Sequence, residues 1–168
     1  MTNPKSRLSM TNPWHLLATG FGSGLSPVVP GTMGTLASVP VYLLLAHLPL
    51  TAYVVVVIAA SLIGIKICQV TSNDMQVHDH GSIVWDEFAG FWITMLIVPA
   101  LQLPVFDWKW VVTGFVLFRF FDMVKPWPIG WLDKRVHGGL GIMIDDLVAG
   151  VMSAIVLAAI GHWAGWLS

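Results

Sequence analysis

The fold is decided by residues 145–167, which read DDLVAGVMSAIVLAAIGHWAGWL. Two aspartates, Asp145 and Asp146, stand directly before a run that contains no Asp, Glu, Lys or Arg. That run has the length of about 20 apolar residues that a helix needs to cross a bilayer. Because ionisable groups beside hydrocarbon are costly unless they are paired or bind a ligand, such groups indicate a functional site. The stretch therefore predicts a membrane helix with a polar site at one end.

The rest of the chain shows the same contrast between charge-free blocks and a charged middle part. Hydrophobic residues make up 56% of the 168 residues and charged residues 10%, against about 25% charged in soluble proteins. Fifteen of the 17 charged residues lie between Lys66 and Asp146, whereas residues 8–65 and 88–106 carry none. The net charge of −1 gives no indication of nucleic-acid binding. We therefore expect one membrane domain over residues 1–168.

The apolar blocks predict an all-α, polytopic membrane helical bundle, because exposed sheet edges are not stable in hydrocarbon. If successive blocks cross in alternating directions, the amino terminus, residues 68–87 and residues 122–146 lie on one face of the membrane. Most Lys and Arg residues fall on that face and Lys109 on the other, which places the polar face in the cytoplasm. Only the last block has the full length of a span. The expected blocks are residues 36–47, 51–67, 88–103, 110–121 and 147–167.

The first polar motif is a loop rich in glycine and proline over residues 20–34, which read GFGSGLSPVVPGTMG. Its backbone amides could cradle a phosphate at the amino terminus of a helix that begins near Thr35. Ser23 and Thr32 are then the expected substrate-binding hydroxyls. The motif lacks the Gly-Lys-Ser/Thr ending of a nucleotide-binding P-loop. Taken alone, a tight surface turn explains it equally well.

Two further motifs share one pattern, in which His and Gly are followed by an apolar triplet, paired acids and small residues. They are residues 78–90, HDHGSIVWDEFAG, and residues 137–150, HGGLGIMIDDLVAG. The small residues one turn after the acids let two helices approach closely, so both acid pairs could converge on shared cations. Helix capping would explain one acid of a pair, but it does not explain Asp79 between two histidines. Metal ligation is therefore the better interpretation of these motifs.

The fourth motif carries three charged residues at equal spacing. Arg119, Asp122 and Lys125 step by three along a predicted helix that Pro126 ends, so they lie on one side of it. A ladder of ion pairs on the protein surface is the alternative interpretation. Because these charges interrupt phenylalanines at a membrane boundary, a phosphate-binding cation beside a metal-binding aspartate fits the motif better.

Oxygen ligands without cysteine favour Mg²⁺, which carboxylates and a substrate phosphate hold together, although the histidines leave Mn²⁺ or Zn²⁺ open. The expected site combines catalytic and metal-holding acids with side chains that bind the phosphate of a substrate, and Lys125 is expected to be catalytic as well. The acids are Asp79, Asp86, Glu87, Asp122, Asp145 and Asp146, and the substrate-binding residues are Arg119, Lys125, Ser23, Thr32 and His137.

Together, the four motifs resemble the phosphatidylglycerophosphatase A family, whose members are integral membrane enzymes of bacterial phospholipid synthesis. The resemblance runs from about Asn12 to Ala158. It implies an all-helical, Mg²⁺-dependent phosphatase that converts phosphatidylglycerol phosphate to phosphatidylglycerol and inorganic phosphate. It also implies a multi-pass protein of the bacterial inner membrane, with the lipid substrate and the bilayer as its partners and with no nucleic acid. The oligomeric state stays open.

The sequence leaves two nucleophiles open for a phosphatase, and two other classes of membrane protein are alternatives to it. The nucleophile is either a water molecule activated by the metal or a carboxylate that forms an aspartyl phosphate. A transporter would need ionisable residues in the middle of its spans, whereas the acids are expected at span ends. A CDP-alcohol phosphotransferase also uses aspartates and metal at the membrane edge, but its aspartate spacing is absent. The phosphatase is therefore the predicted function.

Overall fold

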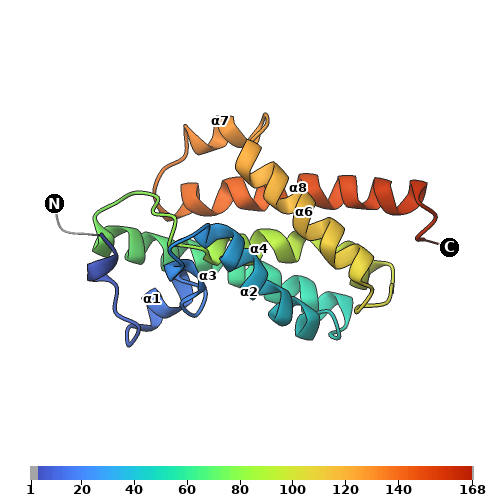
Figure 1. Ribbon diagram of the computed structural model, residues 1–168, viewed down its shortest axis with the longest axis horizontal. Helices are drawn as coiled ribbons and strands as arrows, with labels where there is room; N and C mark the ends of the chain where they lie inside the picture. The colour runs from blue at the N-terminus through green and yellow to red at the C-terminus, as the bar shows by residue number, and fades with distance from the viewer. Residues whose placement is uncertain (1–3, 168) are drawn as a thin grey trace.

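The computed structural model describes residues 4–167, and every regular element within them is a helix (Figure 1). This confirms the predicted all-α class. The elements are η1 (Pro4–Arg7), α1 (Pro13–Ala18), η2 (Ser23–Leu25), α2 (Pro30–Leu45), α3 (Leu50–Met75), α4 (Trp85–Thr94), α5 (Ile97–Ala100), α6 (Trp108–Val124), α7 (Ile129–Asp133) and α8 (Gly138–Trp163).

Helix α4 lies in the middle of the bundle, where it contacts α2, α3, α6 and α8 (Figure 1). It is buried on nearly all sides, and Phe88, Phe91 and Trp92 are at most 4% exposed. A helix that is apolar all round is stable only in such an interior. Its first turn carries Asp86 and Glu87, so α4 brings both acids into the bundle with it.

Helices α3 and α8 are each 26 residues long and apolar enough to cross a membrane. At 1.5 Å per residue each rises about 39 Å, which exceeds the hydrocarbon thickness of a bilayer. The expectation that only the last apolar block reaches span length is therefore wrong. The reason is that α3 continues past its apolar run, through polar residues, to Met75.

The helix boundaries also differ from the ends of the expected apolar blocks. A block ends where polar residues begin, whereas a helix can continue through polar residues as long as its backbone hydrogen bonds are made. Helix α8 begins at Gly138, so Asp145 and Asp146 lie about two turns inside it and not at its end. The block 88–103 is broken into α4 and α5, since Pro99 lacks the N–H that a continuous helix needs there. The remaining blocks, 36–47, 51–67 and 110–121, correspond to Pro30–Leu45, Leu50–Met75 and Trp108–Val124.

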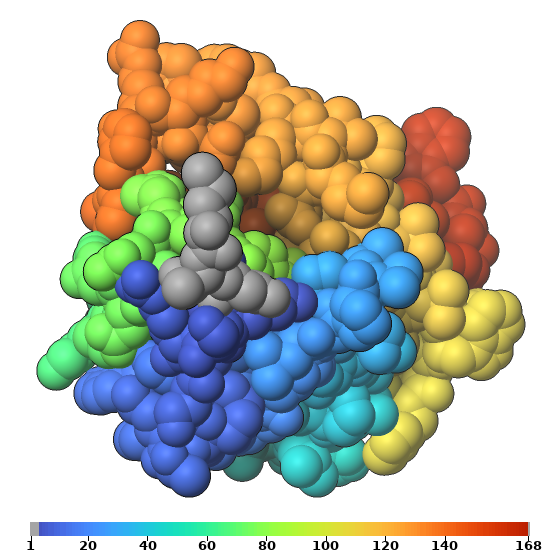
Figure 2. All heavy atoms as spheres, turned by 60° about the vertical axis from the view of Figure 1, so that its left-hand side comes forward, coloured from blue at the N-terminus to red at the C-terminus, as the bar shows by residue number. Residues whose placement is uncertain are grey.

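The bundle has two distinct ends, and one of them gathers the polar segments. The backbone N–H of Gly138 donates to His78 Nε2 at 2.8 Å, and His15 Nε2 lies 2.9 Å from Asp74 Oδ2. The amino-terminal segment and the two charged loops therefore lie together, as expected from alternating directions. We call this the polar end; it is on the left in Figure 1 and turned toward the viewer in Figure 2. At the opposite end the ring of His47 packs against that of Phe106, with 5.5 Å between the ring centroids.

Helices α4 and α8 approach so closely that two glycines are required between them. A Cβ atom at Gly150 would lie 2.4 Å from the carbonyl oxygen of Gly90, and one at Gly90 would lie 2.7 Å from that of Asp146. Both distances are shorter than any real Cβ contact, so the two backbones touch. This confirms the expectation that small residues one turn after each acid pair allow close helix packing.

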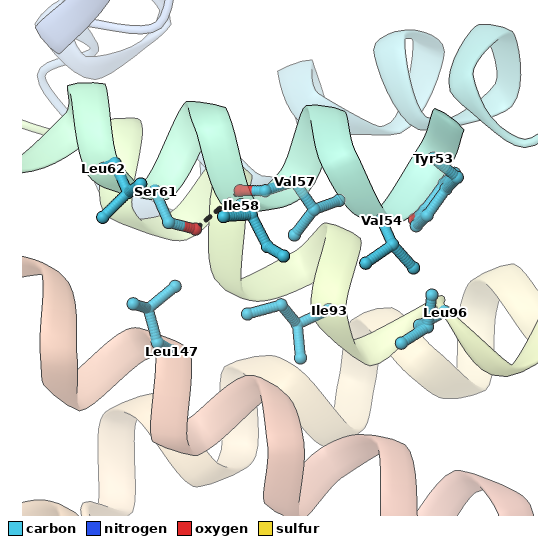
Figure 3. A pocket seen from close by; sticks show the side chains of 9 residues that line it. All are labelled: Tyr53, Val54, Val57, Ile58, Ser61, Leu62, Ile93, Leu96 and Leu147. Carbon is cyan, nitrogen blue, oxygen red and sulfur yellow. Dashed lines mark hydrogen bonds between the residues drawn. The ribbon is translucent and has the colours of Figure 1, made fainter. Parts of the chain in front are cut away.

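An apolar groove of about 320 Å³ lies between α3 and α8, with α4 as its floor (Figure 3). Its lining includes Val57 on α3, Ile93 on α4 and Leu147 on α8. The hydroxyl of Ser61, a polar group in the lining, donates to the carbonyl of Val57 at 2.8 Å. The groove walls therefore expose only hydrocarbon, as is typical of helices that face lipid.

Candidate functional site

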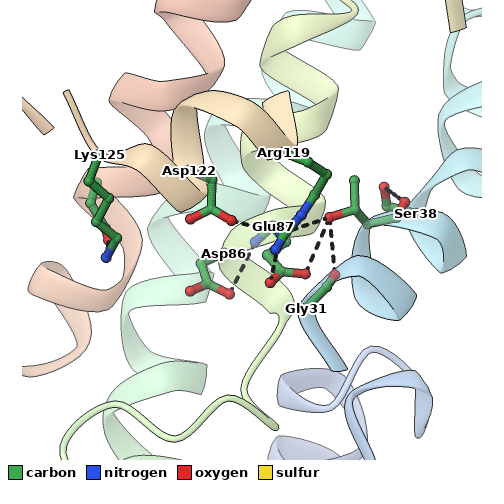
Figure 4. Close-up of polar contacts among 9 residues, drawn as sticks. Gly31, Ser38, Asp86, Glu87, Arg119, Asp122 and Lys125 are labelled. Carbon is green, nitrogen blue, oxygen red and sulfur yellow. Dashed lines mark hydrogen bonds and ion pairs between the residues drawn. The ribbon is translucent and has the colours of Figure 1, made fainter. Parts of the chain in front are cut away.

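Three helices bring five carboxylates together at the polar end. Helix α4 supplies Asp86 and Glu87, α6 supplies Asp122, and α8 supplies Asp145 and Asp146. The residues on α4 and α8 are buried, with 3–8% of their surface exposed. Asp146 interacts electrostatically with the other four, and Asp86 and Asp122 lie between the two neighbouring cations (Figure 4). The two acid pairs therefore converge, as their shared sequence pattern predicts.

The first cation, Arg119, is held by two of these acids. Its Nη1 atom lies 2.7 Å from Asp122 Oδ2 and 3.1 Å from Glu87 Oε1, and it donates to Thr35 Oγ1 at 3.3 Å (Figure 4). The Thr35 hydroxyl in turn lies 3.3 Å from Glu87 Oε2. Because the Arg119 side chain is only 14% exposed, these contacts fix it between α2, α4 and α6. Arg119 thus stabilises two buried carboxylates.

The glycines at the start of α2 form a seat for the Glu87 carboxylate. A Cβ atom at Gly31 would lie 2.3 Å from Glu87 Oε1 and 3.0 Å from Arg119 Nη2. One at Gly34 would lie 2.6 Å from Glu87 Oε2. These glycines therefore let the α2 backbone approach a buried acid, and the phosphate cradle expected from the sequence stays a prediction.

The second cation, Lys125, links the acid cluster to a surface carboxylate. Its Nζ atom lies 2.6 Å from Asp145 Oδ2 and 2.8 Å from Asp133 Oδ1. Burial lowers the pKa of Lys125, but the hydrogen bonds to Asp133 and Asp145 raise it by more, so the pKa lies above its ordinary value. The side chain is 28% exposed, twice as much as that of Arg119. Lys125 is therefore a charged group that solutes can reach.

The cluster holds five carboxyl groups beside two cations, and two of its oxygen atoms lack partners. Asp145 Oδ1 and Asp146 Oδ2 are buried and make no hydrogen bond to any described residue. Within residues 4–167, no three His, Cys, Asp or Glu side chains form a ready-made metal site. The donor set nevertheless fits a hard cation, because Mg²⁺ prefers carboxylate oxygens and completes its shell with water or phosphate.

The histidine motif before α4 lies beside the cluster. Asp79 is exposed and interacts electrostatically with Asp86 and Asp145. His80 Nδ1 accepts from the Ser82 N–H at 3.1 Å, and burial together with the charge of Lys5 lowers the pKa of His80. The motif thus contributes one carboxylate near the acids and stabilises its own loop.

Three predicted substrate-binding residues lie outside the acid cluster. The Ser23 hydroxyl donates to the carbonyl of Gly20 at 2.9 Å, inside the loop itself. Thr32 is half-buried in the first turn of α2. The ring centroid of His137 lies 5.6 Å from that of His78. In the described part of the chain no hydrogen bond joins these three side chains to the acids, and their binding roles stay predictions.

Sequence reasoning missed two residues that the structure brings to the site. Thr35 contacts both Glu87 and Arg119, and Asp133 binds Lys125. Thr35 stands one helical turn after Gly31, so the helix period was a usable signal for it. The position of Asp133 depends on the chain turn after α6, for which the sequence offered no comparable signal.

Comparison with known proteins gives a consistent result. The sequence model of a family described as Phosphatidylglycerophosphatase A matches residues 16–161. A protein named Phosphatidylglycerophosphatase A from Escherichia coli (strain K12) is 61% identical over 158 residues, which cover 94% of this chain and 89% of that protein. One of the same name from Haemophilus influenzae is 46% identical over 162 residues, 96% of each chain. No solved structure matches the chain.

The glycine seat predicts a coupling between Gly31 and Glu87. Gly31→Ala should lower the thermal stability of the detergent-solubilised protein, because overpacking costs about 1–3 kcal/mol while better helix propensity returns only about 0.5–1 kcal/mol. In a Glu87→Asp background the side chain is one methylene shorter, so Gly31→Ala should lower the thermal midpoint by less. Thermal midpoints of the wild type, both single variants and the double variant measure this coupling.

Gly81→Ala is the matched control, since a Cβ there would lie 3.6 Å from its nearest neighbour, Pro30 Cγ. Its effect should be small and should simply add to that of Glu87→Asp. An equal cost of Gly31→Ala in both backgrounds would contradict the seat.

Proposed function

The chain belongs to the phosphatidylglycerophosphatase A family and is a phosphatase, and we propose that it removes the terminal phosphate of phosphatidylglycerol phosphate. The products are phosphatidylglycerol and inorganic phosphate, and the reaction is a step of phospholipid biosynthesis. The observation that carries this proposal is the convergence of two buried acid pairs with Lys125 at the polar end. Both pairs lie inside the region that matches the family.

We further propose that the enzyme requires Mg²⁺. The unpartnered oxygens of Asp145 and Asp146, in a cluster of five carboxyl groups beside two cations, support this requirement. When bound, such a cation neutralises charge on the phosphoryl oxygens and holds the group in place. The carboxylates that would hold it are Asp79, Asp86, Glu87, Asp122, Asp145 and Asp146.

The two cationic side chains receive different roles. Arg119 already binds Glu87 and Asp122 through one nitrogen and is largely buried, so we assign it to the positioning of these acids. Lys125 is more exposed and is attached by a flexible stem, so its ammonium can exchange a carboxylate for a phosphate oxygen. Charge on the transferred phosphoryl group is redistributed in the transition state, and a nearby ammonium stabilises it there.

The proposed membrane arrangement is a multi-pass protein of the bacterial inner membrane whose polar end faces the cytoplasm. Support comes from the two helices of span length, α3 and α8. The basic residues of the polar end also agree with the preference of Lys and Arg for cytoplasmic segments. These residues are Lys5, Arg7, Lys66, Lys125, Lys134 and Arg135.

The acid cluster predicts a set of inactive but folded variants. Asp86→Asn, Glu87→Gln, Asp145→Asn and Asp146→Asn should each lower kcat by about 100-fold or more, since each removes charge from the site while preserving shape. Phosphate release from phosphatidylglycerol phosphate, measured with and without Mg²⁺, tests this.

Asp107→Asn is the control. Asp107 caps α6 at the opposite end by accepting from the Lys109 N–H, and Asn caps a helix as well as Asp does, so activity should hardly change. Near-wild-type turnover in both members of either acid pair would exclude that pair from the reaction.

A second prediction concerns the charge of Lys125. Lys125→Met keeps most of the stem and removes the ammonium, so kcat at saturating substrate should fall about 100-fold. A titration with Mn²⁺ should still show metal binding, because a protonated lysine is not a ligand. Lys109→Met, at the opposite end, is the matched control and should leave turnover unchanged. Unchanged turnover in Lys125→Met would remove Lys125 from the reaction, and lost Mn²⁺ binding would show that it holds the acids instead.

The membrane arrangement predicts the accessibility of single cysteines. In a Cys68→Ser background, a membrane-impermeant thiol reagent should label Phe106→Cys in intact cells. It should label Asn73→Cys, at the polar end, only after the inner membrane is permeabilised. The reversed pattern would overturn the cytoplasmic orientation, and labelling of both positions in intact cells would overturn the spanning arrangement.

A further inference from the structure

Beside the acid cluster, the polar end holds a cavity of about 160 Å³. It lies where α7, the start of α8 and the loop before α4 meet, and Figure 2 shows the surface hollowed between the orange and green segments there. Of its residues, His137 was expected from the sequence to bind substrate, whereas His78 and Lys134 have no role in the proposed reaction. The polar residues that line it are His78, Asp79, Asp133, Lys134 and His137.

The walls of this cavity are held in place by backbone contacts. His78 Nε2 accepts the N–H of Gly138 at 2.8 Å, so the neutral ring carries its proton on Nδ1 as a donor. A Cβ atom at Gly141 would lie 2.3 Å from the carbonyl oxygen of Val136, which shows how tightly the chain turns into α8. The cavity thus combines donors and acceptors on a rigid frame.

One wall of the cavity is connected directly to the acid cluster. Asp133, which lines the cavity, accepts from Lys125 Nζ at 2.8 Å, and the same nitrogen lies 2.6 Å from Asp145 Oδ2. A phosphate bound at Lys125 would therefore lie next to whatever fills the cavity.

The segment that supplies Asp133 and Lys134 to the cavity also carries side chains typical of a membrane interface. Trp127 and Trp131, on either side of the start of α7, are 80% and 46% exposed. Arg135 lies over the Trp131 ring at 4.6 Å from its centroid. Exposed tryptophan with a basic residue is typical of the level of lipid headgroups. The same segment thus supplies residues of the cavity and residues suited to the level of lipid headgroups.

We propose that this cavity binds the part of the lipid headgroup between the departing phosphate and the diacylglycerol, namely its glycerol hydroxyl and its phosphodiester. The hydroxyl donates to a carboxylate of Asp79 or Asp133, and the diester oxygens accept from Lys134 and the histidines. The proposal rests on the phosphatase function above and deepens it. Phosphatidate, whose phosphate is attached directly to diacylglycerol, cannot fill the cavity.

A site built to hydrogen-bond a substrate group discriminates against an analogue that lacks it, because its polar atoms then stay unpaired. The cavity therefore determines specificity for headgroup length. Selectivity is the ratio of kcat/KM for phosphatidylglycerol phosphate to kcat/KM for phosphatidate with the same acyl chains, both in mixed micelles.

His137→Ala and Lys134→Met should each lower this ratio by about tenfold, the effect of one charged or well-placed hydrogen bond. The loss should appear mainly as a higher KM for phosphatidylglycerol phosphate. Lys134 is exposed, so Lys134→Met tests the proposal even if the histidine variant folds poorly. His162→Ala and Lys109→Met, at the opposite end, are matched controls that should keep the wild-type ratio.

Two results would overturn the inference. In both cavity variants, wild-type kcat/KM on both lipids would show that the cavity does not contact the headgroup. An equal loss on both lipids would show that it only supports the fold. A wild-type protein that releases no phosphate from phosphatidylglycerol phosphate would instead overturn the proposed function itself.

Discussion

The burial of carboxylates between apolar helices is the constraint on which the rest of the structure depends. Asp86, Glu87, Asp145 and Asp146 are at most 8% exposed, and an isolated charge in such surroundings is strongly unfavourable. Arg119 and Lys125 offset part of this cost, because each pairs with one acid of a pair. The carboxyl groups that neither cation pairs with are the physical basis for the proposed Mg²⁺.

Close backbone contact makes this arrangement possible. Gly90 and Gly150 let α4 and α8 touch one turn below the acids, and Gly31 lets α2 reach the Glu87 carboxylate. A Cβ atom at any of these positions would overlap a neighbouring atom, so one of the two elements would have to shift. Since ion pairs weaken with distance, the glycines contribute to the electrostatics of the site.

The motifs of the sequence predict much of this site, for reasons that particular residues illustrate. Asp86 and Glu87 stand at the start of α4, as their position before an apolar run indicates. The repeated pattern of acids and small residues predicts that the two pairs converge. The helix period places Thr35 on the same face as Gly31, but its contact with Glu87 and that of Asp133 with Lys125 could not be assigned in the same way, because these partners lie on other segments. Such contacts depend on packing, which a local pattern does not encode.

By itself the sequence determined the helical class, the end of the bundle that is polar and the acids that gather there. Hydrophobic blocks and the cost of charge beside hydrocarbon are local properties, and they can be read along the chain. Only the tertiary structure decided which cation pairs with which acid, that α8 begins before its acids, and that the glycine loop seats Glu87. These features depend on distances between side chains from different helices, and those distances exist only once the helices have packed.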